Sequence, residues 1–126
     1  MNVGLWVLQV LLALVFLAHG WMMLFPSPEI AAQMNANLPR WFSLFIGVAE
    51  VAAFVGLLLP GVTRIMPFLV GWAAVGLMIV MVSAAGYHAL RGEYSGVVTT
   101  LILFALVSFL AYGRLRLKPI RARVAA

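Results

Sequence analysis

The sequence predicts an all-α, polytopic membrane protein: a bundle of four transmembrane helices with a short surface helix in the first loop. Of its 126 residues, 66% are hydrophobic and 9% are charged, whereas soluble domains are roughly half apolar and a quarter charged. The apolar residues also fall in four long runs. A core this small cannot hide so much apolar surface from water, so lipid must be the solvent for most of it. The length allows one domain, residues 1–126.

The first apolar run, residues 3–25, is long enough to cross a hydrocarbon layer of about 30 Å at a helical rise of about 1.5 Å per residue. Pro26 ends it. The polar segment that follows begins with Ser27, Pro28 and Glu29. This pattern is typical of a helix N-terminus, with a capping hydroxyl, a first-turn proline and an acid that favours the helix dipole. We therefore expect the short surface helix here.

Three further runs complete the predicted bundle, and residues that break helices or suit turns follow the first two of them. A Pro-Gly pair follows the second run and an Arg-Gly-Glu turn follows the third. The predicted spans are 41–59, 66–90 and 97–112, and a basic tail covers 113–126.

The distribution of positive charge predicts the orientation. With four spans the two termini share one side, which carries six of the eight Lys and Arg residues. By the positive-inside rule we expect both termini in the cytoplasm and the protein in the cell inner (plasma) membrane. The cations are not interleaved with exposed aromatics, so we expect no nucleic acid partner. Five of them suit a contact with anionic lipid or with a partner: Arg114, Arg116, Lys118, Arg121 and Arg123.

Ionisable residues inside the spans are the candidate functional residues. An ionised side chain at the centre of a bilayer costs about 2.5 to 3.5 kcal/mol on insertion scales. Glu50 lies near the predicted midplane of the second span, and Gly47 on the same helical face lets another helix approach. Gly76 offers similar packing support in the third span. We expect one outward-opening pocket, lined by His19, Glu50, Ser83, Tyr87, His88 and Glu93.

Two interpretations of Glu50 remain open. It can be interhelical glue, bonded to a His or to Tyr and Ser hydroxyls, or it can bind a ligand or handle a proton. For His88 alone, a place at the pocket rim is favoured over a ligand-binding role. The two histidines lack the paired spacing of a metal-binding helix, so the sequence predicts no metal site and does not favour haem. The chain has no cysteine, which excludes thiol redox chemistry within it.

Three segments carry a resemblance to a known family: 17–25 (LAHGWMMLF), the stretch from 46 (IGVAE) to Pro60, and 87–93 (YHALRGE). They resemble the DoxX-like family of small four-span membrane proteins. That family often has a Lys where Met23 stands, which leaves His19 as the expected partner of Glu50. The family name comes from a quinone-linked sulfur oxidoreductase subunit, and other relatives are tied to redox complexes. The resemblance therefore implies a redox-associated membrane subunit, by analogy.

Three functions follow as hypotheses. The first is a redox-associated subunit that binds a quinone or another small apolar molecule in the outward pocket, beside a membrane-embedded or peripheral redox partner. The second is a non-catalytic anchor or assembly subunit that uses its basic tail. The third is a transporter or channel component, which with four short spans would need a homo-oligomer. The residues leave open whether the chain catalyses a reaction.

Overall fold

The computed structural model describes residues 2–37 and 39–123, and their side chains apart from 33–37. It confirms the predicted fold class. Four helices are long and apolar enough to cross a membrane, and a short helix lies in the first loop. The elements are α1 (Asn2–Leu24), α2 (Pro28–Asn37), α3 (Arg40–Thr63), α4 (Phe68–Leu90), α5 (Tyr94–Tyr112) and a π-helical turn η1 (Gly113–Leu117). A helix pairs most of its backbone groups within itself, as a segment in lipid must.

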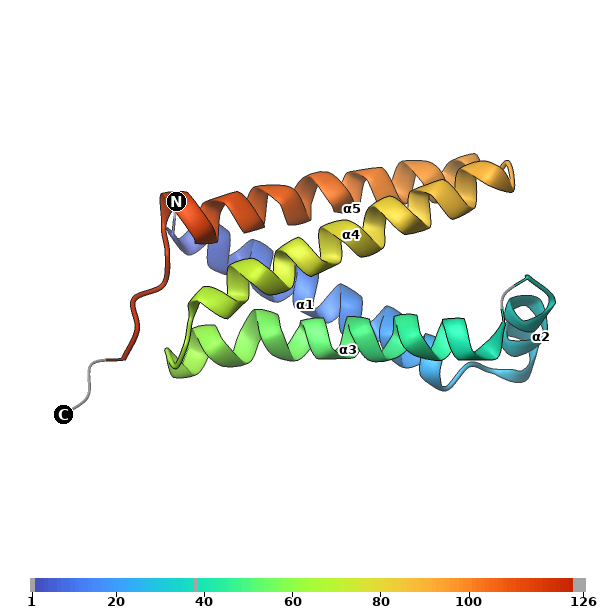
Figure 1. Ribbon diagram of the computed structural model, residues 1–126, viewed down its shortest axis with the longest axis horizontal. Coiled ribbons are helices and arrows are strands. Elements are labelled where there is room, and N and C mark those ends of the chain that lie inside the picture. The colour runs from blue at the N-terminus through green and yellow to red at the C-terminus, as the bar shows by residue number, and fades with distance from the viewer. Residues whose placement is uncertain (1, 38, 124–126) are drawn as a thin grey trace.

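The helices form two pairs, α1 with α3 and α4 with α5. Residues 2 and 123 lie at one end of the bundle, which we call the tail end, and α2 lies at the other, which we call the α2 end (Figure 1). The turn between α3 and α4 holds these helices close at the tail end, and they diverge toward the α2 end (Figure 1). The two helix pairs are therefore packed at one end and splayed at the other.

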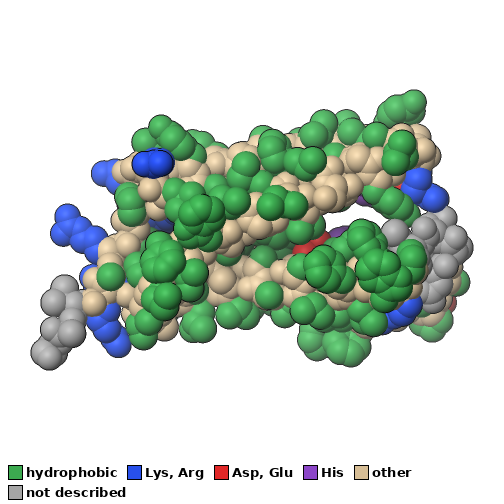
Figure 2. Space-filling view, in the orientation of Figure 1, with side chains coloured by type: hydrophobic (Ala, Val, Ile, Leu, Met, Phe, Trp, Pro, Cys, Tyr) green, Lys and Arg blue, Asp and Glu red, His purple; other side chains and the backbone are tan. Residues whose placement is uncertain are grey.

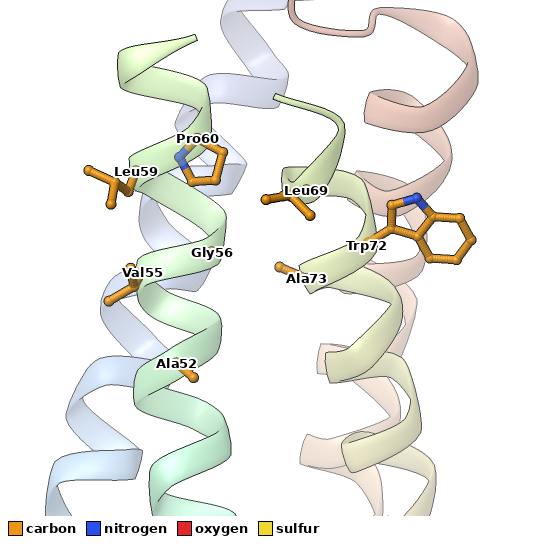
Figure 3. A pocket seen from close by; sticks show the side chains of 8 residues that line it. All are labelled: Ala52, Val55, Gly56, Leu59, Pro60, Leu69, Trp72 and Ala73. Carbon is orange, nitrogen blue, oxygen red and sulfur yellow. The ribbon is translucent and has the colours of Figure 1, made fainter. Parts of the chain in front are cut away.

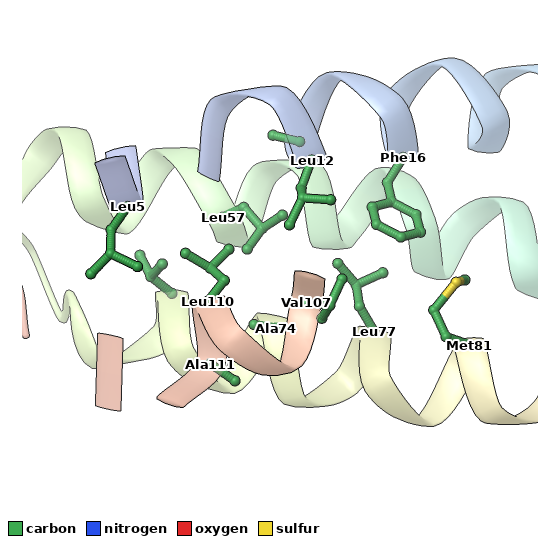
Figure 4. Close-up of a cluster of buried hydrophobic side chains, with 12 residues drawn as sticks. Leu5, Leu12, Phe16, Leu57, Ala74, Leu77, Met81, Val107, Leu110 and Ala111 are labelled. Carbon is green, nitrogen blue, oxygen red and sulfur yellow. The ribbon is translucent and has the colours of Figure 1, made fainter. Parts of the chain in front are cut away.

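The buried apolar core fills the tail half of the bundle (Figure 4). All four long helices contribute to it, and toward the α2 end it stops at Phe16 of α1 and Met81 of α4. From Val82 to Leu90 every side chain of α4 is exposed or half-buried. The interior of the α2 half is therefore not filled by apolar packing between the two pairs.

Two helices differ in length from their predicted spans. The second span does not end at Leu59, because α3 continues through Pro60 to Thr63 and stops at Arg64, which has a left-handed φ of 59°. Pro60 has no N–H for the carbonyl one turn earlier, and the next carbonyl, of Leu57, accepts a hydrogen bond from the Gln9 amide. Such help from a neighbouring helix lets a proline sit inside a membrane helix. The fourth span begins earlier than predicted and runs on through η1.

The short helix α2 begins where the sequence predicts. The Ile30 amide donates to the Ser27 hydroxyl over 3.4 Å, a long capping bond. Pro28 occupies the first helical position and Glu29 the first turn. The loop thus turns back as a helix at the α2 end, next to the start of α3.

Candidate functional site

Two glycines bring the backbones of α1 and α3 together in the α2 half. A Cβ built at Gly20 would lie 3.0 Å from the Gly47 carbonyl oxygen, and a Cβ at Gly47 would lie 2.8 Å from the Leu24 side chain. Contacts this short leave no room for a larger residue. The close approach carries the side chains on either side of it into reach of one another, as small residues do between membrane helices.

His19 and Glu50 meet beside this crossing. The His19 Nδ1 atom lies 2.5 Å from a Glu50 carboxyl oxygen, a short charge-assisted hydrogen bond. The Glu50 side chain is 1% exposed, whereas the His19 side chain is 48% exposed. The pair is net neutral when Nε2 of His19 carries one proton and a second proton lies between Nδ1 and the carboxyl oxygen, whichever of these two atoms holds it. A carboxyl group can therefore stay deep among apolar atoms while its partner imidazole reaches the protein surface.

Arg40 fastens the end of α1 to the start of α3. Its two terminal nitrogens donate to the carbonyls of Met23 and Leu24, over 3.0 and 2.9 Å. These carbonyls are in the last turn of α1, where a cation is favoured. Ser43 is buried beside Arg40 and donates to the Arg40 carbonyl, so it does not join the face of Glu50 as a polar partner. These bonds hold α1 and α3 together about one turn after His19 in α1 and nearly three turns before Glu50 in α3.

A hollow separates the two helix pairs in the α2 half, as Figure 2 shows, with acidic and histidine side chains at its edge. It lies where the apolar core has stopped and where α4 has no buried side chain. The α1–α3 pair, which carries Glu50 and His19, lies on one side of it, and α4 and α5 lie on the other (Figures 1 and 2).

Three other predicted pocket residues, Tyr87, His88 and Glu93, make contacts at the turn between α4 and α5. His88 Nδ1 lies 3.1 Å from a Glu93 carboxyl oxygen, and the same oxygen accepts from Arg91 over 3.3 Å. The Arg91 guanidinium lies over the Tyr87 ring, 5.5 Å from its centroid. The His88 hydrogen bond holds the pKa of the Glu93 carboxyl below its usual value, and Arg91 adds to this. We call these four residues the rim cluster.

Ser83 and Gly76 lie outside both groups. The Ser83 hydroxyl donates to the Ile79 carbonyl one turn earlier in α4, so its hydrogen bond stays within its own helix. A Cβ built at Gly76 would have no atom within 4 Å, so this glycine gives no close helix contact. In α4 that role falls to Gly71, which lies against Leu115 of η1.

Arg114 is the predicted tail residue whose place differs most. It is 3% exposed, whereas Arg116, Lys118, Arg121 and Arg123 are exposed. The helix continues past Tyr112 as η1, and this extra turn directs Arg114 into the bundle. Its Nε donates to the Gln9 side chain over 2.9 Å. Gln9 shares a helical stripe with His19 on the first helix, and this pattern in the sequence signals an inward polar face.

The surface also carries an apolar groove of about 510 Å³ between α3 and α4 in the tail half (Figure 3). Its lining includes Gly56, Pro60, Trp72 and Ala73. The groove faces the lipid and has no ionisable residue in its lining, so it offers no polar recognition. Among the described residues, no three His, Asp or Glu side chains come together as a metal site requires.

The fold and this site define a small four-helix integral membrane protein with a buried carboxyl–imidazole pair between its first and third helices. A family model matches residues 7–110, and its description is the DoxX-like family. The chain belongs to the DoxX-like family. No curated protein and no solved structure matches it.

Proposed function

We propose that this protein binds a small apolar molecule with a hydrogen-bonding head group, such as a quinone, in the hollow between its two helix pairs. The single observation behind the proposal is the His19–Glu50 pair beside that hollow, one member buried and the other half-exposed. Burying a carboxyl at this depth costs free energy. If the position served packing alone, an apolar residue would fill it without that cost. The half-exposed imidazole presents the pair to anything that enters.

The chemistry of the pair suits a carbonyl-bearing head group. His19 uses Nδ1 for Glu50, which leaves the other ring nitrogen, Nε2, for a ligand. In the net neutral pair Nε2 carries a proton whether the second proton lies on His19 or on Glu50, so Nε2 donates to the carbonyl of the head group. Apolar walls would hold the ring and tail of the ligand, and lipid can supply it laterally. Electrons for any redox step would come from a partner protein, in keeping with a redox-associated subunit.

Direct binding tests this proposal. The purified protein in mild detergent is titrated with a short-chain ubiquinone, and quenching of tryptophan fluorescence reports the Kd. His19→Ala and Glu50→Gln each should weaken binding about 10-fold, the loss expected for one hydrogen bond to a charged or strongly polar group. His88→Ala, the same kind of change in the rim cluster, is the matched control and should leave the Kd within about twofold. Unchanged affinity in both site variants would refute the proposal.

A non-catalytic anchoring role is the second candidate, and the exposed tail supports it. Arg116, Lys118, Arg121 and Arg123 project from the tail end, and each of them is exposed. They suit an acidic partner surface or anionic headgroups. Replacing all four by Gln should abolish recovery of a partner complex from mild detergent, while Glu50→Gln leaves it intact. The reverse pattern would favour the ligand-binding proposal.

A further inference from the structure

The buried guanidinium of Arg114 carries an inference that is independent of the proposed function. Arg114 is the second residue of η1, where the helix widens after α5. Gly113 lets α1 approach closely here, because a Cβ on Gly113 would lie 2.6 Å from the Leu5 side chain of α1. The first helix thus packs directly onto the end of the fourth span. The Arg114 side chain enters this junction and is 3% exposed.

Neutral groups hold three of the N–H bonds of Arg114. Its Nε donates to Gln9, and its Nη1 donates to the Asn2 side chain over 2.7 Å and to the Lys118 carbonyl over 3.0 Å. Its guanidinium carbon lies 5.2 Å from the centroid of the Trp6 ring. The remaining nitrogen, Nη2, is buried and has no hydrogen-bond partner among residues 2–37 and 39–123. The residues around Arg114 therefore leave the two N–H groups of its Nη2 atom without an acceptor.

No acidic side chain balances this charge. The chain has three acidic residues: Glu29 in α2, Glu50 bonded to His19, and Glu93 in the rim cluster. The tail end instead carries Arg64 and the four exposed tail cations. A buried charge without a counter-ion is costly. An anion at Nη2 would remove that cost, and the surrounding cations would attract it.

A short strap lies beside the site, and the Lys118 carbonyl at its start accepts a hydrogen bond from Arg114 Nη1. We use this name for residues 118–123, which cross the tail end to the turn after α3. The Arg123 amide donates to the Arg64 carbonyl over 2.7 Å, and the Arg64 side chain donates to the Arg121 carbonyl over 2.9 Å. These bonds join exposed residues, so they can open at low cost. Arg64 and Met66 both have positive φ values, of 59° and 50°, and such strain concentrates where segments switch.

We infer that Arg114, supported by Gln9 and Asn2, binds a phosphate-type oxyanion at the tail end, and that the strap closes over it. The two free N–H bonds of Nη2 suit phosphate oxygens, which arginine recognises strongly. The phosphodiester of an anionic phospholipid and free inorganic phosphate share this chemistry. The position of Arg114 at the end of a membrane span places it near the level of lipid headgroups.

Thermal unfolding of the full chain in mild detergent tests the inference, with three additions compared: phosphatidylglycerol, phosphatidylcholine and inorganic phosphate. Phosphatidylglycerol should raise the Tm of the wild type by several degrees more than phosphatidylcholine does. Arg114→Gln should lose most of this extra shift, which corresponds to about tenfold weaker binding. Arg116→Gln removes an exposed cation two residues away and should keep the shift. If inorganic phosphate gives the same Arg114-dependent shift, the occupant is the free ion; if it gives none, it is the lipid headgroup.

Two results would overturn the inference. One is an equal loss of the shift in Arg114→Gln and Arg116→Gln, which would mean diffuse attraction to the basic tail. The other concerns the wild type alone and so does not depend on folding of a variant. Native mass spectrometry of the protein with equimolar phosphatidylglycerol and phosphatidylcholine should show one preferentially retained phosphatidylglycerol. No preference there would remove the site. Neither result bears on ligand binding near Glu50, which is measured separately.

Discussion

Removing the His19 ring should destabilise the bundle through Glu50 and not through lost packing. Glu50 is 1% exposed, and His19, at 2.5 Å, is its one hydrogen-bond partner among the described residues. Leaving a buried polar group unpaired costs about 1 to 3 kcal/mol. Measured hydrogen bonds between membrane helices average about 0.6 kcal/mol and reach about 1.7. Because this bond is short and charge-assisted, we expect His19→Ala to cost about 1.5 to 2 kcal/mol.

Glu50→Gln should cost less, under about 1 kcal/mol, because the amide keeps the shape and can still bond to His19. The more telling variant is the double change His19→Ala with Glu50→Leu. It removes the unpaired carboxyl, so it should recover at least half of the stability that His19→Ala loses. His88→Ala is the control: its partner Glu93 is exposed to water, and we expect a change within about 0.5 kcal/mol.

Reversible unfolding in mixed micelles, titrated with dodecyl sulfate and followed by far-ultraviolet circular dichroism, gives these free energies. The reasoning fails if the double variant is no more stable than His19→Ala. It also fails if His19→Ala and His88→Ala cost the same. Either result would mean that the pair is not coupled in the folded bundle.

Three further predictions concern the frame around the site. Gly20→Ala should force α1 and α3 apart and cost about 1 to 3 kcal/mol in the same unfolding assay. Gly76→Ala adds a Cβ that meets open space and should leave the stability unchanged. Equal effects of the two changes would contradict the close crossing. Arg40→Gln removes two hydrogen bonds to the last turn of α1 and should speed hydrogen exchange at that helix end, an effect that the core should not share. In a carbon-13 titration, the Glu93 carboxyl should titrate below its usual pKa of 4.5. Its ion pair therefore stabilises the turn above pH 4.5, and this stabilisation is lost as the pH falls through the lower pKa. His88→Ala should return the pKa of Glu93 toward 4.5, and no return would contradict the pairing.

The fold was predictable because lipid imposes simple demands on a sequence. A span must be about 20 residues long, apolar and helical, so the four long apolar runs indicated four spans. The Ser27-Pro28-Glu29 pattern indicated the short helix. The ends were harder to predict. Pro60 suggested a helix end, but a side chain from the first helix supports the neighbouring carbonyl and α3 continues. Contacts between distant segments of this kind leave no local signal.

The candidate site was predictable in part for the same reason. The cost of burying Glu50 required an inward face and a polar partner, and the family resemblance, with Met23 in place of the usual Lys, left His19 as the expected partner. Depth could not show how the helices rotate about their axes, so the contacts of His88 with Glu93 and of Arg91 with Tyr87 were not predicted. Arg114 was assigned to the surface because a basic tail is usually solvated. The extra turn η1 instead directs its side chain into the bundle.

Photo-crosslinking in native membranes tests the central claim most directly. The protein is irradiated with an azido-quinone, digested and analysed by mass spectrometry, with and without an excess of unlabelled short-chain quinone. The account predicts labels on the first helix around His19 and on the third around Glu50, both suppressed by the competitor. Labels that the competitor leaves unchanged, or that fall mainly in the lipid-facing groove around Trp72, would contradict it.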